Sequence, residues 1–276
     1  LLDDPVQIKF LKRFVADFEI AHQFEPPVIS AEKSQDRVAV IGGGPAGISC
    51  VFYLAQKGYQ VTVCEALPEP GGMAAVGIPD YRLPREILRR EVEIVRKAGV
   101  EIRYNTRIGV DKTIGDLWEE GFKAIFIGVG SHESKAMGVE GEEKGYQGFI
   151  SGVRFLRDIN LEREVYRGDK VVVVGGGNVA IDCARSAFRV GFKEVNIVYR
   201  RSRKEMPADA VEIEDAEREG VKIHFLTLPT RIIAEDGKIK AVECIRMELG
   251  EPDSSGRRRP IPVKGSEFIL ETDVLI

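Results

Sequence analysis

The residues best suited to chemistry in this chain are three glycines at the end of an apolar run. Gly42, Gly44 and Gly47 follow the run 37–41 (RVAVI) and match the pattern G-x-G-x-x-G. In a strand–turn–helix unit the first glycine permits a tight turn, the second admits a pyrophosphate, and the third lets the helix pack on the strand. Free N–H groups at the helix start favour an anion without a lysine. The pattern predicts a dinucleotide site; a glycine-rich turn that binds nothing is the alternative.

The residues after this turn favour an adenine dinucleotide with free ribose hydroxyls. A second strand is predicted over residues 60–64 (QVTVC), and it ends at Glu65. An acid about 20 residues beyond the first glycine is placed to accept hydrogen bonds from a ribose.

The pattern occurs a second time, with a different ending. The run 170–174 (KVVVV) leads into Gly175, Gly177 and Ala180, a G-x-G-x-x-A turn, and the next predicted strand is followed by Arg200 and Arg201. Arginine can form two parallel hydrogen bonds with a phosphate. The basic pair therefore predicts a second ligand that carries a 2′-phosphate, and a solvated basic turn is the alternative.

Composition limits the class of protein. The chain has 276 residues, of which 43% are hydrophobic and 30% charged, enough for two globular domains. A net charge of −4 gives no general attraction to nucleic acid or to an anionic membrane. No apolar run approaches the ~20 residues of a membrane span. We expect a cytoplasmic protein with neither kind of partner.

The four cysteines match no metal-site or disulfide spacing and are predicted to be core residues. A disulfide reductase of the thioredoxin-reductase type would need a close redox pair, which these spacings do not supply. His132, near the glycines at 128 and 130, is expected to have no catalytic role.

Apolar spacing and turn residues predict the elements that position these sites. Helices are expected over Val6–His22, Pro45–Lys57, from Pro84 to Gly99, over Ser151–Asn160 and over Ala208–Glu219. A hairpin is expected at 235–238 (EDGK), an exposed loop with a basic tip over Asp253–Arg259, and a last strand that is cut short at Ile276, as in a fragment.

The segment 67–83 combines glycine and proline with apolar residues. It follows the first predicted dinucleotide site directly, so we expect it to lie against a flat cofactor ring, with an ordinary surface loop as the alternative.

Four strings resemble a known family: EALPEPGGM (65–73), GIPDYRLP (77–84), GGGNVAIDCAR (175–185) and VYRRSRKEMPA (198–208). They resemble the small subunit of glutamate synthase. The same module is similar to the flavin half of dihydropyrimidine dehydrogenase and to the large subunit of the bifurcating NADH-dependent ferredoxin:NADP oxidoreductase.

The resemblance implies an α/β fold of two Rossmann-like dinucleotide-binding domains, with the NADP domain inserted into the FAD domain. Residues 1–36 would be a helix and linker that end an iron–sulfur domain. Residues 37–159 would form the first part of the FAD domain, 160–270 the NAD(P) domain, and 271–276 the start of the strand returning to the FAD domain.

The resemblance also implies the cofactor contacts. The FAD pyrophosphate would be held by Gly42, Gly44, Pro45, Ala46 and Gly47, and its ribose by Glu65. Gly72, Met73 and Arg82 would lie along the flavin, and Ile108 and Gly130 would add backbone contacts. The NADP pyrophosphate would be held by Gly176, Gly177, Asn178 and Val179.

These expectations describe an NAD(P)H-dependent FAD oxidoreductase. Hydride would pass between NADP(H) and FAD, and electrons would go to iron–sulfur centres of a missing domain or of an iron–sulfur or flavin-containing partner subunit. The cofactors carry such chemistry, so no catalytic side chain or metal ligand is expected here. A non-catalytic scaffold or an electron-wiring subunit is the alternative from another class.

Overall fold

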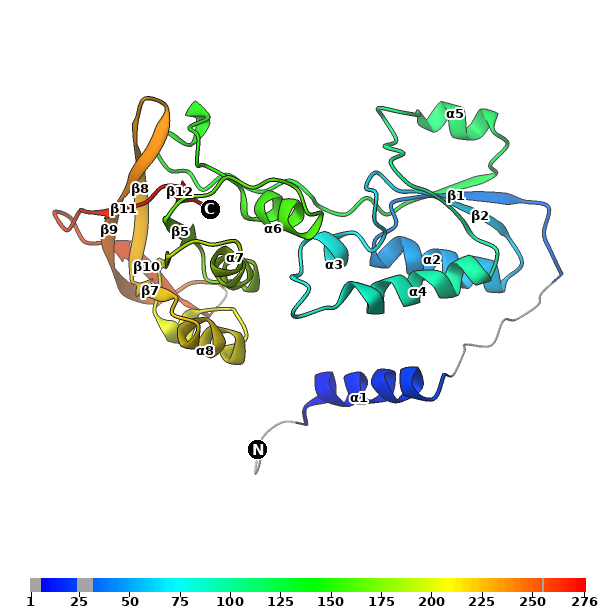
Figure 1. Ribbon diagram of the computed structural model, residues 1–276, viewed down its shortest axis with the longest axis horizontal. Coiled ribbons are helices and arrows are strands. Elements are labelled where there is room, and N and C mark those ends of the chain that lie inside the picture. The colour runs from blue at the N-terminus through cyan, green and yellow to red at the C-terminus, as the bar shows by residue number, and fades with distance from the viewer. Residues whose placement is uncertain (1–5, 24–31, 255) are drawn as a thin grey trace. The chain divides into compact units, whose positions relative to one another are not determined.

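The computed structural model describes residues 6–23, 32–254 and 256–276, and they form two compact units (Figure 1). The first unit comprises the described residues up to Pro68 together with Arg89–Gly128. The second comprises Glu69–Leu88 and Val129–Ile276. The chain therefore leaves the first unit after Pro68, returns to it at Arg89 and leaves it again after Gly128.

The first unit is built on a parallel sheet of strand order β3-β2-β1-β4. Its strands are β1 (Arg37–Ile41), β2 (Gln60–Cys64), β3 (Glu101–Arg103) and β4 (Ala124–Ile127), and its helices are α1 (Ile8–Ala21), α2 (Pro45–Gln56), α4 (Arg85–Lys97, which begins in the second unit) and α5 (Ile114–Glu119). α2 is the crossover between β1 and β2, so the predicted strand–turn–helix unit is confirmed.

Alternation along β1 explains how this sheet is covered. Val40 packs with Val51 of α2 and Val95 of α4 on one face, whereas Ala39 packs with Leu117 of α5 on the other. Successive side chains of a strand point to opposite faces, so one short apolar run supplies both cores. Figure 1 shows α2 and α4 on one side of this sheet and α5 on the other.

The second unit contains a parallel sheet of order β12-β5-β6-β7. Its strands are β5 (Lys170–Val174), β6 (Glu194–Tyr199), β7 (Lys222–Phe225) and β12 (Val274–Leu275), and its helices are α3 (Met73–Val76), α6 (Gly152–Asn160), α7 (Asn178–Arg189) and α8 (Ala210–Arg218), with short 3₁₀ turns η1 (Glu142–Lys144) and η2 (Arg203–Glu205). α7 is the crossover from β5 to β6, and α8 that from β6 to β7.

An antiparallel sheet covers the other face of this parallel sheet. It consists of β8 (Thr227–Glu235), β9 (Lys238–Pro252), β10 (Arg258–Pro262) and β11 (Phe268–Glu271). Val171 and Val173 of β5 pack with Ile181 of α7, and Val172 between them packs with Val242 of β9. The second unit therefore has one core between this sheet and its helices, and a second core, formed mainly by strands, on the other face of the sheet.

The predicted hairpin joins β8 to β9, with Glu235 paired to Lys238. The expectation of an exposed loop over Asp253–Arg259 was wrong at its end, because Arg258 and Arg259 begin β10 and Arg258 pairs with Pro252. Consecutive arginines in a sequence favour an exposed loop, but pairing with β9 places Arg258 and Arg259 in a strand. None of the described helices is long and apolar enough to cross a membrane.

The tight approach of α2 to its strand yields a stability prediction. A Cβ atom at Gly47 would lie 1.9 Å from the Gly42 carbonyl oxygen. Gly47→Ala should therefore destabilise the protein by about 1–3 kcal/mol, as overpacking does, and lower its thermal midpoint. Gly177→Ala is the matched control, because a Cβ atom there would meet no heavy atom within 4 Å. Equal midpoints for the two variants would show that the close approach is not a constraint.

Candidate functional site

The first glycine turn presents the start of α2. Gly42 has φ +101° and its N–H donates to the Cys64 carbonyl across the sheet at 2.9 Å. Gly44 is the N-cap of α2, no side chain caps the helix, and Pro45 is its first residue. The N–H groups of Ala46 and Gly47 belong to the first turn, where no carbonyl four residues back can accept them. The turn thus offers N–H donors and the positive end of a helix dipole to an anion.

Glu65 is fixed beside this turn. It is 5% exposed. Its Oε2 accepts a hydrogen bond from the Gly43 N–H at 2.6 Å, and its Oε1 accepts one from the Leu67 N–H at 2.8 Å. A carboxylate has about four acceptor positions, so capacity for ribose hydroxyls remains. Ile108, predicted to contact the same cofactor, packs at the edge of the cluster around Ile41.

The second turn has the same construction in the second unit. Gly175 has φ +139° and donates its N–H to the Val198 carbonyl at 3.1 Å. Gly177 is the N-cap of α7 and no side chain caps this helix. Asn178 and Val179, its first residues, are exposed. Both glycine turns therefore leave helix N–H groups open to a ligand.

Sequence reasoning missed the residues that brace this second turn. The Gly176 carbonyl accepts a hydrogen bond from the Ala208 N–H at 3.1 Å. The side-chain oxygen of Asn178 accepts one from the Asp209 N–H at 3.0 Å. Asp209 in turn caps α8 through its side chain. The string VYRRSRKEMPA ends at Ala208, directly before Asp209, but only the fold shows that this end returns to the glycines.

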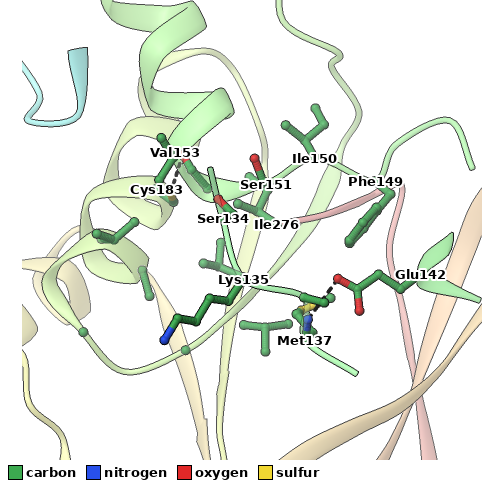
Figure 2. Close-up of a pocket in the computed structure, with 18 of the residues that line it drawn as sticks. Ser134, Lys135, Met137, Glu142, Phe149, Ile150, Ser151, Val153, Cys183 and Ile276 are labelled. Atoms are coloured by element: carbon green, nitrogen blue, oxygen red, sulfur yellow. Dashed lines mark hydrogen bonds between the residues drawn. The ribbon is translucent and has the colours of Figure 1, made fainter. Parts of the chain in front are cut away.

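A cavity of about 610 Å³ opens at the second turn (Figure 2). The end of β5 and the start of α7 form one side of it, and the segments 134–137 and 149–153 form much of the rest. Figure 2 shows side chains from separate segments around it, among them Phe149, Ile150 and Ile276. Cavities of this size with mainly apolar walls and few polar groups suit small ligands and cofactors.

The segment predicted to lie along the flavin belongs to the second unit. Gly72, with φ +54°, is the N-cap of α3, and Met73 is the first residue of that helix. Asn160 of α6 donates its side-chain amide to the Val76 and Ile78 carbonyls at 2.9 and 3.2 Å. Gly130, with φ +67°, is exposed in the same unit.

Arg82 is held by acids of two helices. Its Nη1 donates to both carboxylate oxygens of Asp182 on α7 at 2.8 and 2.7 Å, and its Nε lies 3.1 Å from Glu212 on α8. The Asp182 side chain is only 4% exposed, so the pair is largely withdrawn from water. In this structure Arg82 therefore fastens the segment 69–88 to α7 and α8.

Two further arginines of α7 contact the segment 69–88 and an acid after α8, and the charges of these groups do not change over a wide pH range. Arg185 and Arg189 stack on the Tyr81 ring and both hydrogen-bond to Glu219. The hydrogen bonds from Arg189 hold the pKa of Glu219 at about 2. Burial raises the pKa of Tyr81 to about 12. Neither group changes its charge near neutral pH.

The two arginines after β6 differ in their surroundings. Arg200 is exposed, and Arg201 is 5% exposed and paired with Asp253 at 2.6 Å.

The four cysteines are free, and three of them are buried. Within the described ranges no group of three or more His, Cys, Asp or Glu side chains is placed to hold a metal ion.

The chain belongs to the pyridine nucleotide-disulphide oxidoreductase family, whose model matches residues 36–255. It is 52% identical to the "NADP(+)-dependent formate dehydrogenase subunit beta" of Moorella thermoacetica, over 100% of this chain and 42% of that protein. It is 34% identical to the "Glutamate synthase [NADPH] small chain" of Escherichia coli, over 98% of this chain and 59% of that protein. The chain thus spans less than two thirds of either relative, and the resemblance to the glutamate synthase small subunit is confirmed.

The fold has solved counterparts. The structure of Mycobacterium tuberculosis FprA in complex with NADPH matches with a TM-score of 0.71 and 21% identity, over 88% of this chain and 70% of that one. The predicted α/β class with two Rossmann-like dinucleotide-binding domains is confirmed.

The lowered pKa of Glu219 predicts acid sensitivity of the α7–α8 cluster. Because its folded-state pKa is about 2 and an unfolded glutamate titrates near ~4.3, its stabilising effect is complete above about pH 5 and is lost as the pH falls toward 2. The thermal midpoint of Glu219→Gln should therefore decline less than that of the parent between these values. Glu214→Gln, on the exposed face of α8, should decline like the parent. Parallel decline of all three proteins would contradict the role given to Glu219.

Proposed function

We propose that this chain is the dinucleotide-binding part of an NAD(P)H-dependent flavin oxidoreductase. FAD binds at the turn of the first unit and NADP(H) at the turn of the second. The binding domains of the sequence prediction, 37–159 for FAD and 160–270 for NADP(H), are part of this proposal. The observation that carries it is the presence of two uncapped helix starts, each reached from a parallel strand through a glycine turn.

The residues present fit these groups. At the first turn, Gly44 admits a pyrophosphate beside the first N–H groups of α2, and Glu65 keeps acceptor capacity for a ribose. At the second, Gly176 and Gly177 with the first N–H groups of α7 hold the other pyrophosphate. The adjoining cavity of about 610 Å³ suits a further part of the nucleotide. When bound, the two cofactors supply hydride transfer between nicotinamide and flavin, and the protein supplies orientation and exclusion of water.

The names of the relatives support this assignment. The formate dehydrogenase subunit is called NADP(+)-dependent and the glutamate synthase small chain NADPH-dependent, and both are named as parts of larger assemblies. We therefore propose that electrons leave to an iron–sulfur or flavin-containing partner domain or subunit. The buried free cysteines fit a reducing cytoplasm, which we propose as its location.

The proposal predicts a visible spectrum that responds to one coenzyme. The purified chain with FAD should be yellow, and anaerobic NADPH should bleach it faster than NADH at equal concentration. A protein that stays colourless, or whose colour NADPH cannot bleach, would instead favour a non-catalytic scaffold. Equal rates with both coenzymes would contradict the NADP(H) assignment.

A separate prediction concerns the ribose of FAD. Glu65→Ala should weaken FAD binding by about 1–3 kcal/mol, the range of a charge-assisted hydrogen bond. Glu119→Ala is a suitable control, because Glu119 is an exposed glutamate of the same unit, on α5. Flavin retention through dilution and gel filtration checks it. If Glu65→Ala keeps flavin as tightly as Glu119→Ala, Glu65 does not hold the ribose.

A further inference from the structure

The two glycine turns allow a residue-by-residue comparison of their strand ends. Ile41 pairs with Cys64 in the first sheet, and Val174 pairs with Val198 in the second. The first glycine of each turn donates its N–H to the carbonyl of that partner. The residue after the partner therefore occupies the same position in both units. It is Glu65 in the first unit and Tyr199 in the second.

Tyr199 occupies this position in the second unit, which therefore has no ribose-binding acid there. Its ring lies over Gly176, where an added Cβ atom would be only 2.5 Å from the ring. Its hydroxyl donates to the Glu205 carbonyl at 2.8 Å, and the residue is 6% exposed. The next residue, Arg200, is therefore the first side chain after β6 that reaches solvent beside the turn. Among the described residues it has no hydrogen-bond or ion-pair partner.

The Arg201 side chain is bound by residues at the β9–β10 turn. Its Nε donates to the Arg258 carbonyl at 2.8 Å and its Nη2 to Asp253 at 2.6 Å, both at the β9–β10 turn. Its own carbonyl accepts a hydrogen bond from the Leu226 N–H at 3.1 Å. The side chains of Arg201 and Asp253 are 6% and 24% exposed. A buried cation paired in this way cannot turn to a ligand without giving up its ion pair with Asp253.

We propose that the two adjacent arginines divide their roles, in an inference that rests on the proposed NADP(H) site. Arg200 binds the 2′-phosphate, and Arg201 stabilises the fold. Asp253, from the β9–β10 turn, neutralises Arg201 and holds the segment after β6 against that turn. The selectivity for a 2′-phosphate therefore depends on one arginine, whereas the anchored pair stabilises the fold.

The test compares two small nucleotides that differ only in this phosphate. The dissociation constants of 2′,5′-ADP and 5′-AMP are measured by calorimetry on the whole chain, with FAD in excess to fill the first site. The ratio of the dissociation constant of 5′-AMP to that of 2′,5′-ADP measures recognition of the phosphate, and the thermal midpoint measures the stability of the fold. Arg200→Ala should reduce the ratio by about tenfold or more and leave the midpoint unchanged.

Arg201→Lys and Asp253→Asn should behave oppositely, with a lower midpoint and a ratio within about threefold of the parent. Asp236→Asn is the matched control: it is the same change at the exposed β8–β9 turn and should alter neither quantity. The inference is overturned if Arg201→Lys reduces the ratio as much as Arg200→Ala does. It is also overturned if Asp253→Asn raises the ratio tenfold, because a released Arg201 would then be a phosphate ligand.

The parent protein separates this inference from the function on which it rests. A parent that binds the two nucleotides equally would overturn the NADP(H) assignment together with the inference. A parent that binds 2′,5′-ADP more tightly than 5′-AMP would retain the NADP(H) assignment. If Arg201→Lys then lost this preference and Arg200→Ala kept it, the inference alone would be overturned.

Discussion

Both proposed nucleotide sites depend on a helix whose first turn receives no side-chain cap from the described residues. α2 and α7 start at Gly44 and Gly177 directly after a parallel strand, and no side chain caps either helix. Open donors of this kind are costly unless water or a ligand accepts from them. The close approach of Gly47 to the Gly42 carbonyl fixes the first helix against its strand. The parallel sheets then place the next strand end beside each helix start, where an adenosine ribose would lie.

The two sites differ at one equivalent position, and the proposed assignment of their ligands rests on this difference. Glu65 in the first unit is an acid held by backbone N–H groups, which suits ribose hydroxyls. Tyr199 in the second is an aromatic residue that covers its glycine turn, and Arg200 follows it in solvent. A carboxylate at the position of Tyr199 would repel a 2′-phosphate. The absence of an acid there therefore favours this ligand, as the arginine does. In the proposed assignment, the same strand register thus serves two dinucleotides.

Local signals predicted the strands, the glycine turns and the crossover helices, because apolar periodicity and glycine act over a few residues. The same signals could not show which distant charges meet. Arg82 and Asp182 are 100 residues apart, and their pairing places the segment 69–88 in the second unit. Arg201 and Asp253 are 52 residues apart. In the sequence Arg201 was indistinguishable from Arg200, and burial against the β9–β10 turn is what separates them. Long-range ion pairs of this kind have no periodicity, so only the fold reveals them.

The two proposed sites require that one chain binds two different dinucleotides at separate turns at the same time. Native mass spectrometry of the purified chain incubated with both FAD and NADP⁺ tests it most directly, because it counts each ligand on each molecule. The dominant species should carry one FAD and one NADP⁺. Displacement of FAD by NADP⁺, or a species with two copies of one dinucleotide and none of the other, would contradict it.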